Sequence, residues 1–221
     1  MNKQEREKML KERLEEMKKY ENALYEQGIS YIAGVDEVGR GPLAGPVVTA
    51  CVVLPSDFNI LGVDDSKKIS EKKRDELFEK IKDNALAYAI GMADNLTIDE
   101  INILEATKKA MEEAVIKVDN QLKEKYGKGI EHLLIDALEL KNISIKQQGI
   151  IKGDATSVSI AAASIVAKVT RDRLMIEYAK EYPHYAFEKN KGYGTKAHYE
   201  GIEKVGICPI HRKTFLKKIL L

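Results

Sequence analysis

Two apolar strands that follow one another with no helix between them, and later strands that alternate with helices, constrain the fold of this chain most strongly. The first two strands are expected in YIAGVD, from Tyr31, and in PVVTACVVL at 46–54, where β-branched residues dominate. Their closeness in the chain favours a long hairpin. Together with the later alternation, this order predicts an α/β fold in which helices cover the faces of a mixed sheet.

Three further strands are expected at 85–94, at 132–136 and within 141–154. TIDE at 97–100 fits a capping box that opens a helix running towards Tyr126. A charged helix is expected near 71–83, with Ser70 as its N-cap. A long helix over 157–182 is apolar in its first half and should be buried there, and the basic tail after Pro183 should form short helices and loops.

The N-terminal segment predicts one amphipathic helix over 2–27, because Leu10, Leu14, Met17, Tyr20 and Leu24 recur at helical spacing before Gly28. A length of 221 residues favours one large domain with an appendage. We therefore divide the chain into this helix, residues 1–28, and a domain over 29–221. The apolar stripe is expected to pack on the domain, and a partner-binding arm is the alternative.

Composition narrows the class of protein. Hydrophobic residues make up 44% of the chain and charged residues 32%, which suits a folded domain with a real core. The sequence contains no apolar run of the roughly 20 residues that cross a bilayer, and the charged start MNKQEREKML does not resemble a signal peptide. Two cysteines cannot make a disulfide framework. We therefore expect a cytoplasmic protein without a membrane partner.

Charge is distributed unevenly along the chain. Residues 141–221 contain 15 Lys or Arg and 7 Asp or Glu, a net of +8, which leaves −7 for residues 1–140. This asymmetry permits a nucleic-acid partner, although clustered lysines are more often ordinary solvated surface.

Acidic residues end two of the apolar strands. Asp36 and Glu37 follow YIAGV, Asp136 follows HLLI, and Asp154 stands just before the long buried helix. Buried carboxylates are costly unless they are paired or bind a cation, so convergence of these acids would form a Mg²⁺ or Mn²⁺ site. Asp154 could instead be a helix N-cap, and Asp136 an ordinary carboxylate at a strand end.

Other sites fit the sequence poorly. GRGPLAG resembles a dinucleotide-binding turn, but a β-branched strand follows it where that fingerprint needs a helix. Cys208 and His211 form a lone CxxH without the second pair that a zinc site needs. Cys51, amid valines, is expected to be a small buried hydrophobe.

Four separated motifs carry a resemblance to a known family. GVDEVGRGPLAGPVV, KGDATSVSIAAASIVAKVTRDR, NKGYGT and PIHRKTF occur in order, and together they resemble bacterial ribonuclease HII, the type 2 ribonuclease H, from about residue 29 to the C-terminus. The resemblance implies a ribonuclease H-like fold: a five-stranded mixed sheet flanked by helices, with a helical C-terminal region. GRG at 39–41, where type 3 enzymes have GTG, favours type 2.

The same resemblance implies an activity. It implies an endonuclease that hydrolyses the phosphodiester 5′ of a ribonucleotide in RNA·DNA hybrids or in DNA with embedded ribonucleotides, leaving a 3′-hydroxyl and a 5′-phosphate. The family's metal-binding acids map onto Asp36, Glu37, Asp136 and Asp154, which would hold two divalent cations, Mn²⁺ or Mg²⁺. Many relatives have Gly where this chain has Ala137.

Substrate contacts carry over less completely. Gly39, Arg40 and Gly41 map onto the motif that reads the ribose 2′-hydroxyl, and Tyr193 onto the aromatic residue that stacks on the next deoxyribose. Further phosphate-contacting candidates are Ser66, Lys67, Lys168, Arg171, Lys191 and Arg212.

Two other functions compete with this interpretation. One is a noncatalytic hybrid-binding protein that uses the basic C-terminal part, and the other is a DNA nuclease or resolvase built on the same carboxylates. We expect a monomer. Some family members bind a sliding clamp through a C-terminal peptide, but KKILL at 217–221 contains no convincing motif of this kind.

Overall fold

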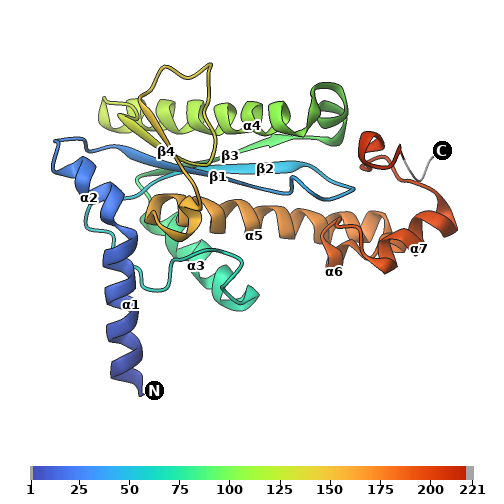
Figure 1. Cartoon of the computed structure of the whole chain (residues 1–221), viewed down its shortest axis with the longest axis horizontal. Coiled ribbons are helices and arrows are strands. Elements are labelled where there is room, and N and C mark those ends of the chain that lie inside the picture. The colour runs from blue at the N-terminus through green and yellow to red at the C-terminus, as the bar shows by residue number, and fades with distance from the viewer. Residues whose placement is uncertain (1, 218–221) are drawn as a thin grey trace.

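The computed structural model describes residues 2–217, and Figure 1 shows a sheet lying between layers of helices. Within these residues five strands form one sheet in the order β3-β2-β1-β4-β5. β1 pairs antiparallel with β2 and β2 with β3, whereas β4 runs parallel to both β1 and β5. The mixed α/β sheet and its initial hairpin are therefore confirmed. The strands are β1 (Ile32–Val38), β2 (Val47–Val53), β3 (Ala87–Ala93), β4 (His132–Asp136) and β5 (Gln147–Ile150).

Helices cover both faces of the sheet. α4 (Asn95–Tyr126) lies along one face, while α5 (Val158–Glu181) and α3 (Glu71–Asn84) lie on the other (Figure 1). Every residue of β2 is buried, as expected for a strand covered on both sides. α5 lies so close to β1 that a Cβ added at Gly34 would be 2.0 Å from the carbonyl carbon of Ser159. The glycine thus allows the helix backbone to rest directly on the strand.

Two helix starts test the capping predictions. Ser70 caps α3 by accepting a hydrogen bond from the Lys73 amide, as predicted. The capping box at 97–100 is wrong, because α4 already begins at Asn95 and the Asp94 carboxylate accepts from the Thr97 amide at 2.8 Å. Asp94 directly follows β3 and caps the first turn before Thr97 can. The helix also kinks at Asn102, whose φ is +69°.

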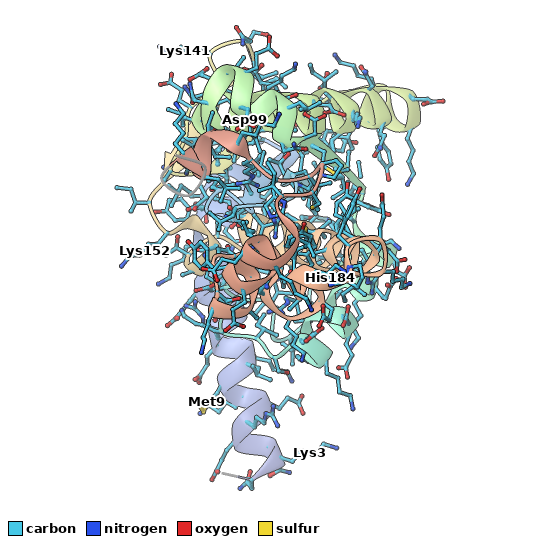
Figure 2. All side chains as sticks on the ribbon, turned by 90° about the vertical axis from the view of Figure 1, so that its right-hand side faces the viewer. Lys3, Met9, Asp99, Lys141, Lys152 and His184 are labelled. Carbon is cyan, nitrogen blue, oxygen red and sulfur yellow. The ribbon has the colours of Figure 1, made fainter. Side chains whose placement is uncertain are left out.

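The N-terminal segment forms two helices where one was predicted. α1 (Lys3–Met17) and α2 (Lys19–Tyr25) meet at Lys18, and the bend allows Met17 and Leu24 both to be buried against the domain. The first turns of α1 extend away from the rest of the chain, as the labelled Lys3 and Met9 show in Figure 2. The apolar stripe thus packs on the domain as expected, but only along its C-terminal part.

The C-terminal region is helical, as expected, and contains η2 (Pro183–Tyr185), α6 (Phe187–Asn190), α7 (Lys196–Val205) and η3 (Lys213–Phe215). It packs against the turn between β1 and β2, where the Leu43 amide donates to the Gly192 carbonyl at 2.8 Å and the Gly45 amide to the Ile210 carbonyl at 2.9 Å. Nearly all of the KKILL segment lies outside the described residues. Within residues 2–217, no helix combines the length and apolar character that spanning a membrane requires.

Candidate active site

The parallel pairing of β1 and β4 brings two of the predicted acids to the same level. Val35 pairs with Ile135, so Asp36 and Asp136 are the next residues on neighbouring strands. Asp36 is only 4% exposed. Burial first, and then the charges of Glu37 and Asp136, raise the pKa of Asp36 well above its ordinary value. Without a cation, the folded chain thus disfavours ionisation of this carboxyl.

Asp36 is held by groups on its own strand and on α5. The Glu37 amide donates to Asp36 Oδ1 at 2.7 Å, and the Ser164 side chain opposes the rise in the pKa of this carboxyl. Ser164 Oγ lies 2.9 Å from Ser66 Oγ, and Ser66 is buried. Ser66, predicted as a phosphate contact, therefore acts on Asp36 only indirectly, through Ser164. Ser164 was not among the residues predicted from the sequence, although a serine in the apolar half of a long helix could have indicated it.

Glu37 has an unsatisfied oxygen. Its Oε1 lies 3.4 Å from a terminal nitrogen of Arg40, while Oε2 is buried without a hydrogen-bond partner in the described structure. Burial raises the pKa of Glu37, and the charge of Arg40 opposes this shift. An orphaned carboxylate oxygen inside a protein is costly, and a cation ligand is one of the few roles that compensates for it.

Asp136 and Asp154 meet at the short 3₁₀ helix η1 (Gly153–Ala155). The Gly153 amide donates to Asp136 Oδ1 at 2.7 Å, which places the next residue, Asp154, beside this carboxyl. Burial raises the pKa of Asp136, and the charge of Asp154 adds to the shift. Lys67 Nζ lies 3.3 Å from Asp154 Oδ2. The N-cap of α5 is Ser157, so Asp154 does not cap that helix.

All four acids therefore belong to one mutually repelling group with only Arg40 and Lys67 as cationic neighbours in the described structure. In residues 2–217, no three His, Cys, Asp or Glu side chains lie close enough together to hold a metal ion by themselves. Oxygen-rich acids that leave positions open suit Mg²⁺ or Mn²⁺, which keep waters and substrate phosphates as further ligands. The residues present thus fit the divalent cations that the sequence predicts.

The loop Gly39–Gly41 follows β1, and two buried arginines bind backbone carbonyls in and around this loop. Arg212 donates to the carbonyls of Gly39 at 2.6 Å, Arg40 at 2.9 Å and Gly45 at 2.9 Å. Arg171 donates to the carbonyls of Ala44, Pro46 and Lys191. A Cβ added at Gly39, whose φ is +92°, would be 2.2 Å from Arg171 Nε. Only glycine fits this position, for reasons of both conformation and space.

Arg171 and Arg212 were predicted as direct phosphate contacts, and the structure corrects this. Both side chains are completely buried. Burial lowers the pKa of Arg171 to about 10 and that of Arg212 to about 9. Each guanidinium uses its fixed fork of donors to satisfy carbonyl groups of neighbouring loops, a geometry that lysine cannot reproduce. Their effect on substrate would be indirect, through the backbone of the glycine-containing loop.

The remaining substrate candidates are more accessible. Tyr193 is 44% exposed, and a Cβ added at Gly41 would lie 3.7 Å from its Cε1, so this ring stands beside the loop. Lys168 Nζ is paired with Asp172 at 2.7 Å. Lys191 Nζ donates to the Glu188 carbonyl. Tyr193 thus keeps the placement expected of a stacking residue, whereas both lysines already have partners within the chain.

His211 of the lone CxxH belongs to a buried relay. The Cys208 amide donates to His211 Nδ1 at 2.9 Å, so His211 donates through Nε2 to His198 Nε2 at 2.9 Å. His198 Nδ1 then donates to the Tyr193 carbonyl at 2.9 Å. These histidines therefore have a structural role, and their hydrogen bonds end at Tyr193, the residue predicted to contact substrate.

A mixed five-stranded sheet with acids at the adjoining ends of two parallel strands and beside a long helix defines a nuclease of the ribonuclease H-like class. The solved ribonuclease H2 from Pyrococcus horikoshii OT3 has this fold, with a TM-score of 0.66 and 28% identity, over 86% of this chain and 96% of that one. The structure of Bst-RNase HIII in complex with Mn²⁺ shares the fold alone, with a TM-score of 0.62 and 19% identity, over 87% of this chain and 67% of that one.

Sequence comparison identifies the particular branch. The model of the family described as Ribonuclease HII matches residues 33–218. A ribonuclease HII from Caldanaerobacter subterraneus subsp. tengcongensis is 58% identical over 208 residues, which cover 94% of this chain and 83% of the relative. The chain therefore belongs to the ribonuclease HII family. It is an endoribonuclease that cleaves RNA in RNA–DNA hybrids, which overturns the noncatalytic alternative.

Proposed function

We propose that this enzyme hydrolyses the phosphodiester on the 5′ side of a ribonucleotide, in hybrids or in duplex DNA with embedded ribonucleotides, and leaves a 3′-hydroxyl and a 5′-phosphate. The proposal extends to two divalent cations, Mg²⁺ or Mn²⁺, as cofactors and to a monomeric enzyme. The single observation that carries it is the set of mutually repelling carboxyls Asp36, which is buried, and Glu37 and Asp136, which are half-buried, whose pKa values are all raised. Such a cluster is stabilised when cations neutralise it.

The acids act as ligands in this proposal. Asp36, Glu37, Asp136 and Asp154 would hold the cations, with Glu37 Oε2 supplying an oxygen that has no other partner. The chemistry that such cations supply when bound is Lewis-acid activation of water and neutralisation of the leaving 3′-oxygen. Lys67, paired with Asp154 at 3.3 Å, would add positive charge near the phosphate.

The loop of Gly39–Gly41 would recognise the ribose through its backbone. A trans peptide points its N–H away from its C=O, and Arg212 binds the carbonyls of Gly39 and Arg40. The amides of Arg40 and Gly41 therefore face away from Arg212 and are available to a sugar hydroxyl. Tyr193, exposed beside Gly41, would stack on the following deoxyribose. Discrimination by the 2′-hydroxyl is the usual way in which proteins distinguish RNA from DNA.

The decisive test is Asp36→Asn, which keeps the shape of the side chain and removes its charge. We expect cleavage of a duplex with one ribonucleotide to fall more than about 100-fold, since loss of even an outer-shell partner of a metal ligand costs roughly 10- to 100-fold. Binding of the duplex should persist. The assay is run with Mg²⁺ or Mn²⁺, with the ribonucleotide at two positions and product ends identified against 5′-phosphorylated markers.

Asp57→Asn is the matched control, because Asp57 is exposed and lies outside the acid cluster. It should cleave like the original enzyme. An Asp36→Asn enzyme with full activity would refute the assignment of the acid. If the cleavage position does not change with the position of the ribonucleotide, or if an all-DNA duplex is cleaved equally well, the alternative of a DNA nuclease is supported instead.

A further inference from the structure

Arg13, on the N-terminal helix α1, contacts two separate loops at once. Its Nε and Nη2 donate to the Asp64 carboxylate at 2.7 and 2.9 Å, and Nη2 also donates to the Ala155 carbonyl at 2.8 Å. One planar guanidinium thus joins residues that are 91 positions apart in the chain. Arg13 lies outside the region matched by the family model, which begins at residue 33, whereas both of its partners lie inside that region.

Both loops lead directly to the acid cluster. Ala155 follows Asp154 within η1. On the other loop, the Asp65 amide donates to Asp64, and the Lys67 amide donates to Asp65 at 2.9 Å. Lys67 Nζ in turn lies 3.3 Å from Asp154 Oδ2, on the first loop. Arg13 therefore closes a ring of contacts that fixes Lys67 and Asp154 relative to each other.

A second N-terminal side chain fixes the same segment from the next helix. Glu21, on α2, is 2% exposed, and its Oε1 accepts from Ser157 Oγ at 2.6 Å and from the Ser159 amide at 3.0 Å. These are the N-cap and an early residue of α5, directly after η1. A carboxylate at a helix N-terminus is favourable, because it satisfies free amides there. Both N-terminal helices thus hold the chain between Asp154 and α5.

We propose that Arg13 is a positioning residue for the metal site, which it orders by tying the Asp154 turn to the Lys67 loop, with Glu21 as a second anchor. The inference rests on the proposed function, since it concerns the affinity of those acids for a divalent cation. It assigns a role in cation binding to the N-terminal helices. An anchor that only attached α1 to the domain would change stability and leave cation affinity unaffected.

The test is equilibrium Mn²⁺ binding, measured by calorimetry on the full chain without nucleic acid, together with thermal unfolding without Mn²⁺. Arg13→Ala removes the guanidinium that joins the two loops. Asp64→Asn removes the charge of its carboxylate partner while keeping the shape of that side chain. We expect each to weaken Mn²⁺ binding about 3- to 10-fold, somewhat less than a direct neighbour of a ligand does. Each should lower the unfolding temperature by only about 2–4 °C. The double variant should match the worse single variant, because both remove one interaction.

Arg6→Ala is the matched control, because Arg6 is an exposed arginine on the same helix with no side-chain ion pair in the described structure. It should bind Mn²⁺ like the original chain. If Arg13→Ala and Asp64→Asn both bind Mn²⁺ within about twofold of the original chain, the positioning role is wrong. If the original chain binds no Mn²⁺, or Asp36→Asn binds it equally, the metal site itself is refuted, and the inference with it.

Discussion

Ala137 directly follows strand β4, which ends at Asp136, and its backbone lies in the left-handed region, at φ +50°. Its amide donates to the Ile150 carbonyl at 3.1 Å, so the turn is fixed by the pairing of β4 with β5. An alanine in this conformation is strained by its Cβ, whereas a glycine is not. A glycine would thus suit the local backbone, and alanine is tolerated here at a cost in stability. The carboxyl of Asp136 is still directed to Gly153.

At this scale we predict that Ala137→Gly stabilises the fold by about 0.5–1 kcal/mol, because relief of the left-handed strain exceeds the added entropy of the unfolded chain. The measurement is the urea midpoint of unfolding. Ala23→Gly, the same change at an exposed position inside α2, should destabilise by about 1 kcal/mol. Equal losses in both variants would show that the turn is not strained.

At the scale of elements, a single capping residue decides where α4 begins. Asp94 follows β3 without a linker and caps α4, and the carboxylate's hydrogen bond to the Thr97 amide lowers the pKa of Asp94. The early start places Asn95 where its side chain donates to the carbonyls of Pro209 and His211 at 2.9 and 3.0 Å. The beginning of α4 is therefore also a docking point for the C-terminal region.

We predict that Asp94→Ala costs about 1 kcal/mol of stability through loss of the cap. Glu100→Ala is the control that distinguishes the observed cap from the capping box predicted at 97–100. Glu100 is exposed within the helix and should change stability by less than about 0.5 kcal/mol. The free energy of unfolding of the two variants, measured by chemical denaturation, distinguishes the two caps. A larger loss of stability in Glu100→Ala than in Asp94→Ala would support the capping box at 97–100.

At the scale of the whole molecule, the C-terminal region is locked against the sheet by buried polar groups. The relay from Cys208 through His211 and His198 ends at the Tyr193 carbonyl, while Arg212 binds the Gly39 carbonyl. Burial lowers the pKa of His211 to about 4 and also lowers that of His198. Both imidazoles are thus neutral in the folded protein, as the relay requires.

This arrangement predicts a loss of stability in mild acid. In the unfolded chain a histidine takes up a proton below about pH 6.5, whereas His211 in the folded chain does so only near pH 4. The unfolded state therefore binds more protons between these values, and stability falls as the pH drops from 6.5 towards 4. We expect His211 to contribute about 1–2 kcal/mol of loss between pH 7 and pH 5.

The comparison is with His211→Gln, which does not titrate in this range. Its unfolding free energy, measured in urea at both pH values, should fall less than that of the original chain. Asp36, Glu37 and Asp136 have raised pKa values and shift stability in the opposite sense, but they are common to both proteins and their contributions cancel. An identical fall in the two proteins would show that His211 is not kept neutral by folding.

Features that depend on local pattern could be predicted from the amino-acid sequence. Alternating apolar segments specified five strands and the long helices, and YIAGVDE and HLLID placed acids at strand ends where burial makes them informative. Ser70 was recognisable as a cap because capping involves residues three apart. The motifs also indicated the family correctly.

The side chains that point into the interior and the loops that meet could not be predicted in this way, because they depend on how the whole chain folds. Arg171 and Arg212 look like surface cations in the sequence, but folding surrounds them with carbonyls from the β1–β2 turn. Arg13 gains its partners only because α1 is placed beside loops far away in the chain. Such contacts join residues with no regular spacing, so they depend on three-dimensional packing and leave no periodic signal in the sequence.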